Sequence, residues 1–152
     1  LRLDIPRQEL SFYRQLDAHG TYTLKKTKNI LYVNAHGPFN EIITQRYAKD
    51  IDEYSCKFHH ANWASLTTFY GDSIFTPAAE KSIISILHNR ADNGLLANAC
   101  IIVGSQCHDL QYMQLKRIHL KANIAFNIFS DLSSAEKWLK TLISSSTMQK
   151  AQ

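Results

Sequence analysis

Two kinds of apolar pattern alternate along the chain, one typical of strands and the other typical of helices. Short runs rich in β-branched and aromatic residues predict strands at 21–26, 30–35, 63–70, 99–103 and 125–129. The polar residues between the first two runs predict that these strands form a hairpin. The run at 99–103 is apolar throughout, which is typical of a strand buried on both faces of a parallel sheet.

Between the later strands, apolar residues recur at steps of three and four and predict helices. One helix begins with Thr76 as its cap and Pro77 in its first turn, and it stops at Asn93 and Gly94. The most regular helix follows an N-capping Asn40. Its predicted buried face consists of Ile43, Tyr47, Ile51, Tyr54 and Phe58.

Two more helices complete the pattern. The third runs from a cap at Asp109 towards Lys121. The last starts at Asp131 or at Ser133, the latter within a capping box closed by Glu136. We expect the third to turn Leu110, Met113 and Leu120 inward, and the last to carry Ala135, Trp138, Leu139 and Leu142.

The resulting order is ββαβαβαβα, which predicts an α/β fold with a mainly parallel sheet and an N-terminal hairpin. We expect one domain over 19–143. A short helical extension over 1–18 precedes it, with Leu10, Tyr13 and Leu16 on one side, and a flexible tail over 144–152 follows.

Several landmarks in this order resemble a known family. They are the sequence AHGPFN at 35–40, Trp63 and Ala64 opening a strand, Thr76 and Pro77 opening a helix, and DLSSAEKWL at 131–139. Over 19–143 the chain resembles the SpoIIAA-like domains, whose fold is shared by STAS and Sec14/CRAL-TRIO domains. The resemblance implies a non-catalytic regulatory module that binds an unidentified protein partner. Kinship with lipid-carrying domains implies an alternative, the binding of a lipid or other small apolar ligand.

In anti-sigma-factor antagonists of this family, a Ser is phosphorylated in an Asp-Ser-Ser-Gly-like turn after the third strand. The matching segment here is GDSIFTP at 71–77, where Asp72 and Ser73 fit and Ile74 and Phe75 replace the second Ser and the Gly. The resemblance therefore implies a partner-binding or regulatory loop containing Asp72, Ser73 and Thr76. Thr76 also serves as an ordinary helix cap.

A second loop, after the 99–103 strand, contains Ser105, Cys107 and His108. Ligands of open parallel sheets bind beyond the carboxyl ends of the strands, so this loop and Asp72 are neighbours if their strands are adjacent. Together they offer an acid, two nucleophiles and a base, which makes a small hydrolase a third alternative. The chain has no Gly-x-Ser-x-Gly elbow, and we expect a ligand loop rather than an enzyme.

Composition adds little to this picture. The 152 residues include 17 Lys and Arg against 13 Asp and Glu, for a formal charge of +4 that is dispersed, so we expect no nucleic-acid partner. No apolar run is long enough for a transmembrane span. Three cysteines without a Cys-x-x-Cys pair favour a reducing, cytoplasmic location.

Histidines and cysteines give no metal-ligand spacing. Cys56, His59 and His60 lie at a predicted helix end, where a His complements the helix dipole, so we expect neither metal nor cofactor. The other single histidines are predicted to lie on the surface or in loops: His19, His36, His88 and His119.

Polar residues interrupt several predicted strands: Asn34, Ser65, Thr67, Thr68 and Asn127. Helices on only one side of the sheet would leave the other face partly open, and these residues fit such a mixed face. That face is then solvated, or covered by the N-terminal helix, or a homodimer surface, or a small-ligand groove. The groove would be lined by Tyr32, Trp63, Phe69 and Tyr70.

Overall fold

The computed structural model describes residues 18–59 and 61–150, so the predicted N-terminal helix lies outside the described residues. Five strands form one sheet in the order β1-β2-β3-β4-β5, with β1 antiparallel to β2 and the other neighbours parallel. The strands are β1 (Thr21–Thr27), β2 (Ile30–His36), β3 (Trp63–Tyr70), β4 (Leu95–Val103) and β5 (Ala125–Phe129). The helices are α2 (Glu41–Cys56), α3 (Pro77–Asp92), α4 (His108–Ala122) and α5 (Leu132–Lys150). The predicted fold class and element order are confirmed.

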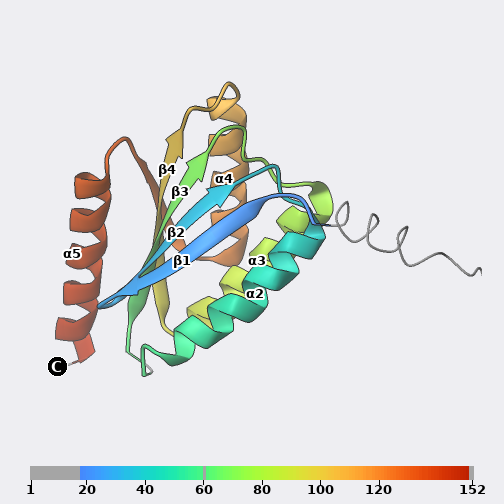
Figure 1. Ribbon diagram of the computed structural model, residues 1–152. Coiled ribbons are helices and arrows are strands. Elements are labelled where there is room, and N and C mark those ends of the chain that lie inside the picture. The colour runs from blue at the N-terminus through green and yellow to red at the C-terminus, as the bar shows by residue number, and fades with distance from the viewer. Residues whose placement is uncertain (1–17, 60, 151–152) are drawn as a thin grey trace, which may run out of the picture.

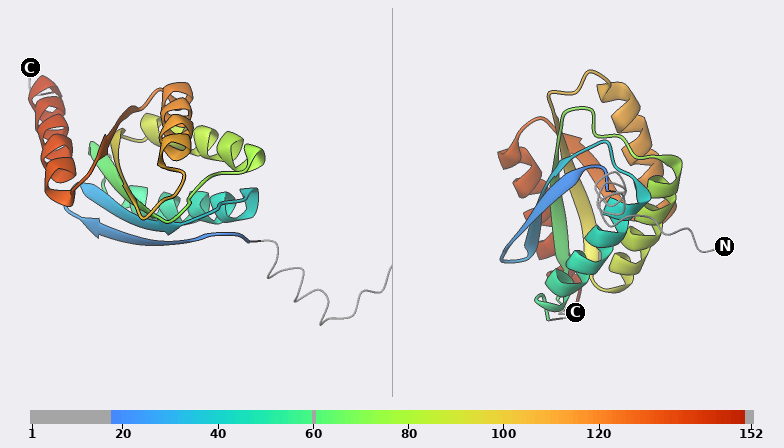
Figure 2. Two further views of the ribbon diagram at one scale, coloured as in Figure 1. Left: turned by 90° about the horizontal axis from the view of Figure 1, so that it is seen from above. Right: turned by 45° about the vertical axis from the view of Figure 1, so that its right-hand side comes forward.

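The sheet lies between two helical layers. α2, α3 and α4 cover one face, and α5 lies alone against the other face (Figures 1 and 2). The second face is therefore partly covered, because α5 crosses to the far side of β3 and β4. β3 is buried on both faces from Trp63 to Phe69, as a central strand between two layers must be.

Each layer has its own core. The larger core joins the sheet to α2–α4 and includes Trp63, Ile51 and Ile118. The smaller core joins the sheet to α5, where Ala64, Ala97, Ala99 and Ala135 pack around Leu66 and Leu139. These alanines let α5 approach the sheet closely, and burial of the leucines supplies the apolar contact.

The hairpin and the first two helix starts match the sequence pattern. β1 and β2 are joined by Lys28 and Asn29, and Lys28 has a φ of 53°. The side chain of Asn40 accepts a hydrogen bond from the amide of Ile43, which makes Asn40 the N-cap of α2.

Three boundaries differ from the prediction. β4 begins four residues earlier, at Leu95. Cys107, not Asp109, occupies the N-cap position of α4 and makes no side-chain cap bond, so Asp109 lies in the first turn. α5 continues to Lys150, so the expected tail from 144 is helical. The side-chain amide of Asn62 donates a hydrogen bond to the hydroxyl of Ser146, which connects this last part of α5 to the loop before β3.

The structure also shows which of the two predicted residues, Asp131 or Ser133, caps α5. Asp131 accepts hydrogen bonds from the amide and the hydroxyl of Ser134, each 2.8 Å long. Glu136 instead accepts a bond from the hydroxyl of Tyr32. Asp131 is therefore the cap, and the capping box of Ser133 with Glu136 does not form.

We predict that Thr76→Ala lowers the free energy of unfolding by about 1 kcal/mol, because the Thr76 hydroxyl accepts the Ala79 amide at 3.2 Å and caps α3. Thr76→Ser keeps the hydroxyl and should stay close to the wild type. Urea denaturation of the three proteins measures this. Equal midpoints for Ala and Ser would show that Thr76 is not an energetically important cap.

Candidate functional site

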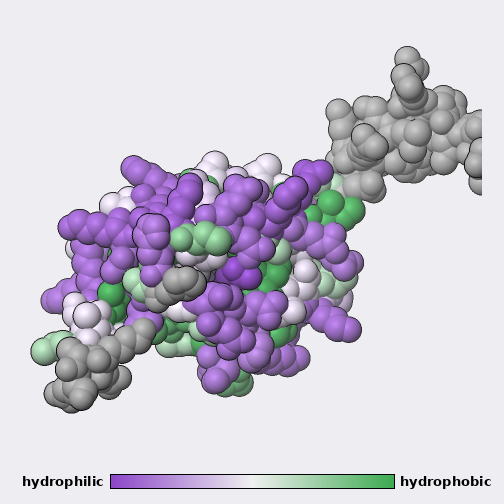
Figure 3. Space-filling view, turned by 90° about the horizontal axis from the view of Figure 1, so that it is seen from below, coloured by the Kyte–Doolittle hydropathy of each residue, from purple (hydrophilic) through white to green (hydrophobic). Residues whose placement is uncertain are grey.

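The parallel strands end at one edge of the sheet, which lies at the top of Figure 1, and the two loops singled out by the sequence meet there. Asp72 Oδ1, in the β3–α3 loop, accepts hydrogen bonds from the amide of Gln106 at 2.8 Å and the hydroxyl of Ser105 at 3.2 Å. The prediction that these loops are neighbours is confirmed, since β3 and β4 are adjacent. The opposite end of the molecule is covered mainly by hydrophilic side chains (Figure 3).

Asp72 is the junction between these loops. The amide of Gln106, followed by the thiol of Cys107 and the hydroxyl of Ser105, holds the pKa of the Asp72 carboxyl below its usual range. The carboxyl is therefore ionised at neutral pH and acts as a hydrogen-bond acceptor.

Ser73 is buried, although it follows an exposed aspartate. Its hydroxyl donates to the carbonyl of Tyr70 and accepts from the amide of Gly37, both at 2.8 Å. A Cβ on Gly37 would lie 2.5 Å from the Cα of Ser73, so only glycine permits this approach of the two loops. With both bonds made and the side chain 2% exposed, the Ser73 hydroxyl is not accessible to a modifying enzyme in this conformation.

Two glutamines of α4, which the sequence did not single out, hold the β3–α3 loop in place. Gln114 accepts a bond from the amide of Phe75 at 2.8 Å and donates one to its carbonyl at 2.9 Å. Gln111 is buried and donates to the carbonyl of Ser73 at 3.3 Å. In the sequence these residues are only two side-chain amides three positions apart on one predicted helix. Such a pair is by itself typical of an exposed helix face.

The second loop does not assemble a nucleophile with its base. The Sγ of Cys107 lies 3.5 Å from Asp72 Oδ1 and 3.6 Å from the Ser105 hydroxyl. His108 is oriented towards Asp109, 3.8 Å away, and makes no hydrogen bond with either nucleophile. The hydrolase alternative therefore stays a prediction without a positioned imidazole base.

Of the candidate metal ligands at the end of α2, Cys56 and His59 are described, whereas His60 lies outside the described residues. Cys56 is exposed, and no group of three His, Cys, Asp or Glu side chains lies close enough to hold a metal among residues 18–59 and 61–150. Within the same residues, no helix combines the length and hydropathy needed to cross a membrane.

The outer face of α4 carries an apolar stripe that we expected to be buried. Leu110, Met113 and Leu120 are 56%, 62% and 78% exposed, so the prediction that they point inward is wrong. The helix instead buries a second stripe that includes polar residues: Gln111, Leu115, Ile118, His119 and Ala122. Both stripes have helical spacing, and contacts with distant residues decide between them.

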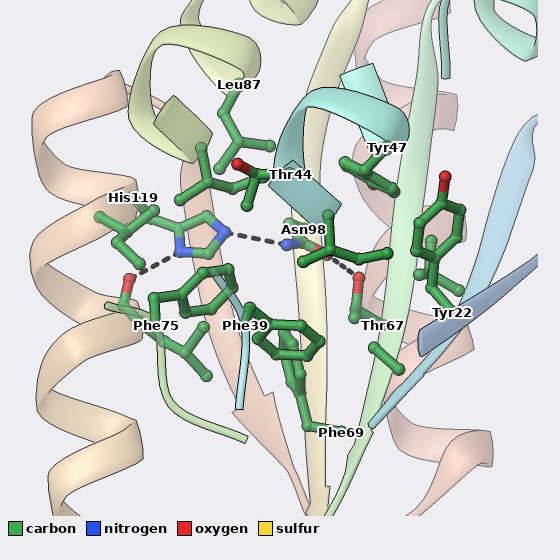
Figure 4. Close-up of a pocket in the computed structure, with 16 residues that line it drawn as sticks. Tyr22, Phe39, Thr44, Tyr47, Thr67, Phe69, Phe75, Leu87, Asn98 and His119 are labelled. Carbon is green, nitrogen blue, oxygen red and sulfur yellow. Dashed lines mark hydrogen bonds between the residues drawn. The ribbon is translucent and has the colours of Figure 1, made fainter. Parts of the chain in front are cut away.

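His119 was expected at the surface, but it is 2% exposed. Its Nδ1 donates to the Leu115 carbonyl at 2.6 Å, which leaves Nε2 to accept from the side-chain amide of Asn98 at 2.8 Å (Figure 4). Asn98 Oδ1 then accepts from the hydroxyls of Ser65 at 3.0 Å and Thr67 at 3.2 Å. With neutral His119, both ring nitrogens, the Asn98 side-chain oxygen and the two hydroxyls each have a hydrogen-bond partner.

The surroundings of His119 disfavour its charged form. Its ring stacks on Phe126, with 4.4 Å between centroids. Burial lowers the pKa of His119 to about 4, although the bond to the Leu115 carbonyl acts in the opposite direction.

An apolar cavity of about 60 Å³ lies beside this network, between the sheet and α2–α4. Phe39, Phe69 and Phe75 line it together with Asn98 and His119 (Figure 4). A cavity of about 150 Å³ is known to hold benzene, so this volume does not accommodate an acyl chain unless the helices move. Binding of a small apolar ligand therefore stays a prediction.

The predicted aromatic groove is divided between the two faces of the sheet. Tyr32 and Tyr70 lie on the α5 side, where they line a groove of about 610 Å³. Trp63 and Phe69 belong to the core under α2–α4. Successive residues of a strand point to opposite faces, so odd and even positions of β3 cannot line one groove.

Comparisons with known proteins identify the fold. No family model matches the chain, and no curated protein matches it. Its structure is similar to that of an uncharacterized protein from the DUF3478 family with a SpoIIAA-like fold, from Shewanella loihica PV-4. The TM-score is 0.57 with 13% identity, over 80% of this chain and 94% of that chain. The SpoIIAA-like fold is thus confirmed, and a likeness at this identity shows the fold alone.

We predict that Ser73→Ala lowers the free energy of unfolding by about 1–3 kcal/mol, because it leaves the half-buried Gly37 amide without its hydrogen bond to the buried Ser73 hydroxyl. Ser133→Ala is the matched control, since Ser133 is exposed. Its effect should stay within about 0.5 kcal/mol. Chemical denaturation measures both, and equal effects would contradict a structural role for Ser73.

A second prediction concerns pH. The pKa of His119 is about 4 in the folded protein, against about 6.5 for an unfolded chain. At a pH between these two values, His119 is protonated in the unfolded chain and neutral in the folded protein. The free energy of unfolding therefore decreases as the pH falls through 6.5. Between pH 7 and pH 5 this loss is roughly 2 kcal/mol.

His119→Gln should remove the part of the pH dependence that comes from His119. The free energy of unfolding of this variant should therefore fall less than that of the wild type between pH 7 and pH 5. His108→Gln, at an exposed position, should keep the wild-type dependence. Urea midpoints at both pH values measure the difference. Parallel pH profiles for His119→Gln and the wild type would show that His119 protonates freely in the folded state.

Proposed function

We propose that the protein is a non-catalytic binding module that acts through contacts with a protein partner. The contact surface, which we call the α4 surface, consists of Leu110, Met113 and Leu120 together with the exposed Asp72 of the neighbouring loop. The observation that carries the proposal is the exposure of all three apolar side chains on one helix face. Exposed large apolar side chains gathered on one helix face are a feature of interaction sites.

The spacing of the three residues supports a single contact. Positions three and seven apart lie on the same side of an α-helix, so the side chains form a stripe along most of α4. The stripe begins two residues after His108, where α4 leaves the loop that bonds Asp72. A partner that lies on α4 therefore also reaches the loop that the family resemblance singled out.

The charges beside the stripe indicate the chemistry of the partner. Lys116 and Lys121 are exposed on either side of the C-terminal part of the stripe, whereas the exposed carboxylates of Asp72 and Asp109 lie at its N-terminal end. Arg117 is held by Glu80 in a two-bond ion pair. Polar or charged rims around an apolar centre are typical of protein interfaces. We therefore propose a partner segment, such as an amphipathic helix, with apolar residues bordered by Asp or Glu.

Ser73 and Thr76 contribute to this surface by positioning the loop. The Ser73 hydroxyl is hydrogen-bonded to the backbone of Gly37 and Tyr70, and Thr76 caps α3. Asp72 and Thr76 are both exposed, and Asp72 is the charged member of the predicted regulatory set. In this proposal the loop binds in the unmodified state.

The experiment compares proteins cross-linked to the tagged wild type, to Met113→Asp and to Met148→Asp. Met148 is 71% exposed on α5 and serves as the matched control for an added carboxylate at an exposed methionine. We expect a partner recovered with the wild type and Met148→Asp to fall at least tenfold with Met113→Asp. The stability of both variants should stay within about 0.5 kcal/mol of the wild type.

Two results would overturn the proposal. Equal recovery of every partner with Met113→Asp would remove the α4 surface from binding. A purified wild type that dimerises in sedimentation experiments, with Met113→Asp monomeric, would show that a second copy of this chain covers the stripe instead. Recovery that also falls with Lys116→Glu would support an acidic partner.

A further inference from the structure

A groove on the α5 side of the sheet is a concave surface that the proposed function does not use. Its volume is about 610 Å³, and it lies between β1–β3 and the start of α5. Sites for small molecules have volumes of about 300–1,000 Å³. It is open to solvent, and the sheet separates it from α4.

A row of three polar side chains crosses its floor. Thr23, Asn34 and Thr68 are direct neighbours in the register of β1, β2 and β3, and all three line the groove. Neighbouring strands are about 4.8 Å apart, so these groups form an evenly spaced row. None of the three side chains forms a hydrogen bond within the described part of the chain.

Thr68 is the decisive member of this row. The residue is only 9% exposed and lines the groove, and its hydroxyl forms no hydrogen bond with another described residue. Its neighbour Thr67, which faces the opposite core, has a bond to Asn98. A hydroxyl on the floor of a groove that has no protein partner can donate a hydrogen bond to a ligand and accept one from it.

The charges around the groove leave one cation free. Glu136 accepts the Tyr32 hydroxyl at 2.8 Å and lies 3.9 Å from the Lys140 ammonium, and Asp131 caps α5. Lys25 also lines the groove and forms no ion pair with any described residue. It lies two residues along β1 from Thr23, about 7 Å away on the same face.

An apolar wall completes the groove. Val103 and Leu132 are 43% and 50% exposed there, and the ring of Tyr70 is stacked on His36 at 4.8 Å. Apolar and aromatic walls with a few placed polar groups are typical of ligand sites, and they suit the C–H faces of a sugar ring.

We propose that this groove binds a small polyhydroxylated molecule with one anionic group, that is, a sugar phosphate or a sugar acid. The hydroxyls and the amide of Thr23, Asn34 and Thr68 both donate and accept hydrogen bonds, so they match the hydroxyls of the ligand. The ammonium of Lys25 pairs with its anionic group. The site is independent of the α4 surface, so either can fail without the other.

The test is a titration of the ¹⁵N-labelled protein with glucose 6-phosphate, ribose 5-phosphate and gluconate, followed by NMR chemical shifts. We expect saturable shifts of the Asn34 side-chain amide and of the backbone amides of Thr23 and Thr68. Glucose and inorganic phosphate, the separate halves of one probe, should each bind at least tenfold more weakly. Binding of the sugar phosphates but not of gluconate would identify the anionic group as a phosphate, and the reverse would identify it as a carboxylate.

Two variants test the named groups. Thr68→Val replaces the unpaired hydroxyl by a methyl group of similar size, and Lys25→Met removes the cation. Each should weaken binding at least tenfold, whereas Lys26→Met, on the opposite face of β1, should leave it unchanged. Thr68→Val should also unfold at the same or a higher urea concentration than the wild type, because no internal bond is lost.

Three outcomes would overturn the proposal. The first is the absence of groove shifts with all three probes at millimolar concentration. The second is binding that Thr68→Val and Lys25→Met leave unchanged. The third is a clear loss of stability in Thr68→Val, which would show that the hydroxyl has a structural partner.

Discussion

Three polar side chains of α4 decide how that helix lies on the sheet. Gln111 binds the carbonyl of Ser73, Gln114 binds both backbone groups of Phe75, and His119 binds Asn98. Buried amides and imidazoles are tolerated only when they are hydrogen-bonded, so these contacts fix the rotation of α4 about its axis. The opposite stripe of leucine and methionine is consequently turned to solvent.

The same contacts organise the loop edge. The β3–α3 loop lies between α4 and the β2–α2 loop, because Ser73 joins Gly37 on one side and Gln111 on the other. Asp72 then lies where it accepts the amide of Gln106. The exposed carboxylate and the α4 stripe are therefore parts of one rigid surface, and preorganisation of this kind lowers the entropy lost on binding.

The five-stranded sheet separates this surface from the groove beside α5. Adjacent residues of β3 lie on opposite faces of the sheet. Thr67 belongs to the His119 network on the α4 side, and Thr68 lines the groove on the α5 side. This alternation explains why polar residues occur in a strand that is buried on both faces. The first completes a core network, and the second is left free for a molecule from outside.

The sequence predicted much of this arrangement. The caps at Asn40 and Thr76 and the adjacency of Asp72 to Ser105 follow from local patterns and from the rule that parallel strands end at one edge. The burial of Ser73 and His119 could not be read in this way, because it depends on Gly37 and Asn98, which are distant in the sequence.

Periodicity alone determined the order of the elements and the residues that share a face. It could not decide which of the two helical stripes of α4 faces the core, or which side of the sheet α5 covers. Those choices were made by tertiary contacts, since a face is buried only where distant residues supply both apolar surface and partners for its polar groups.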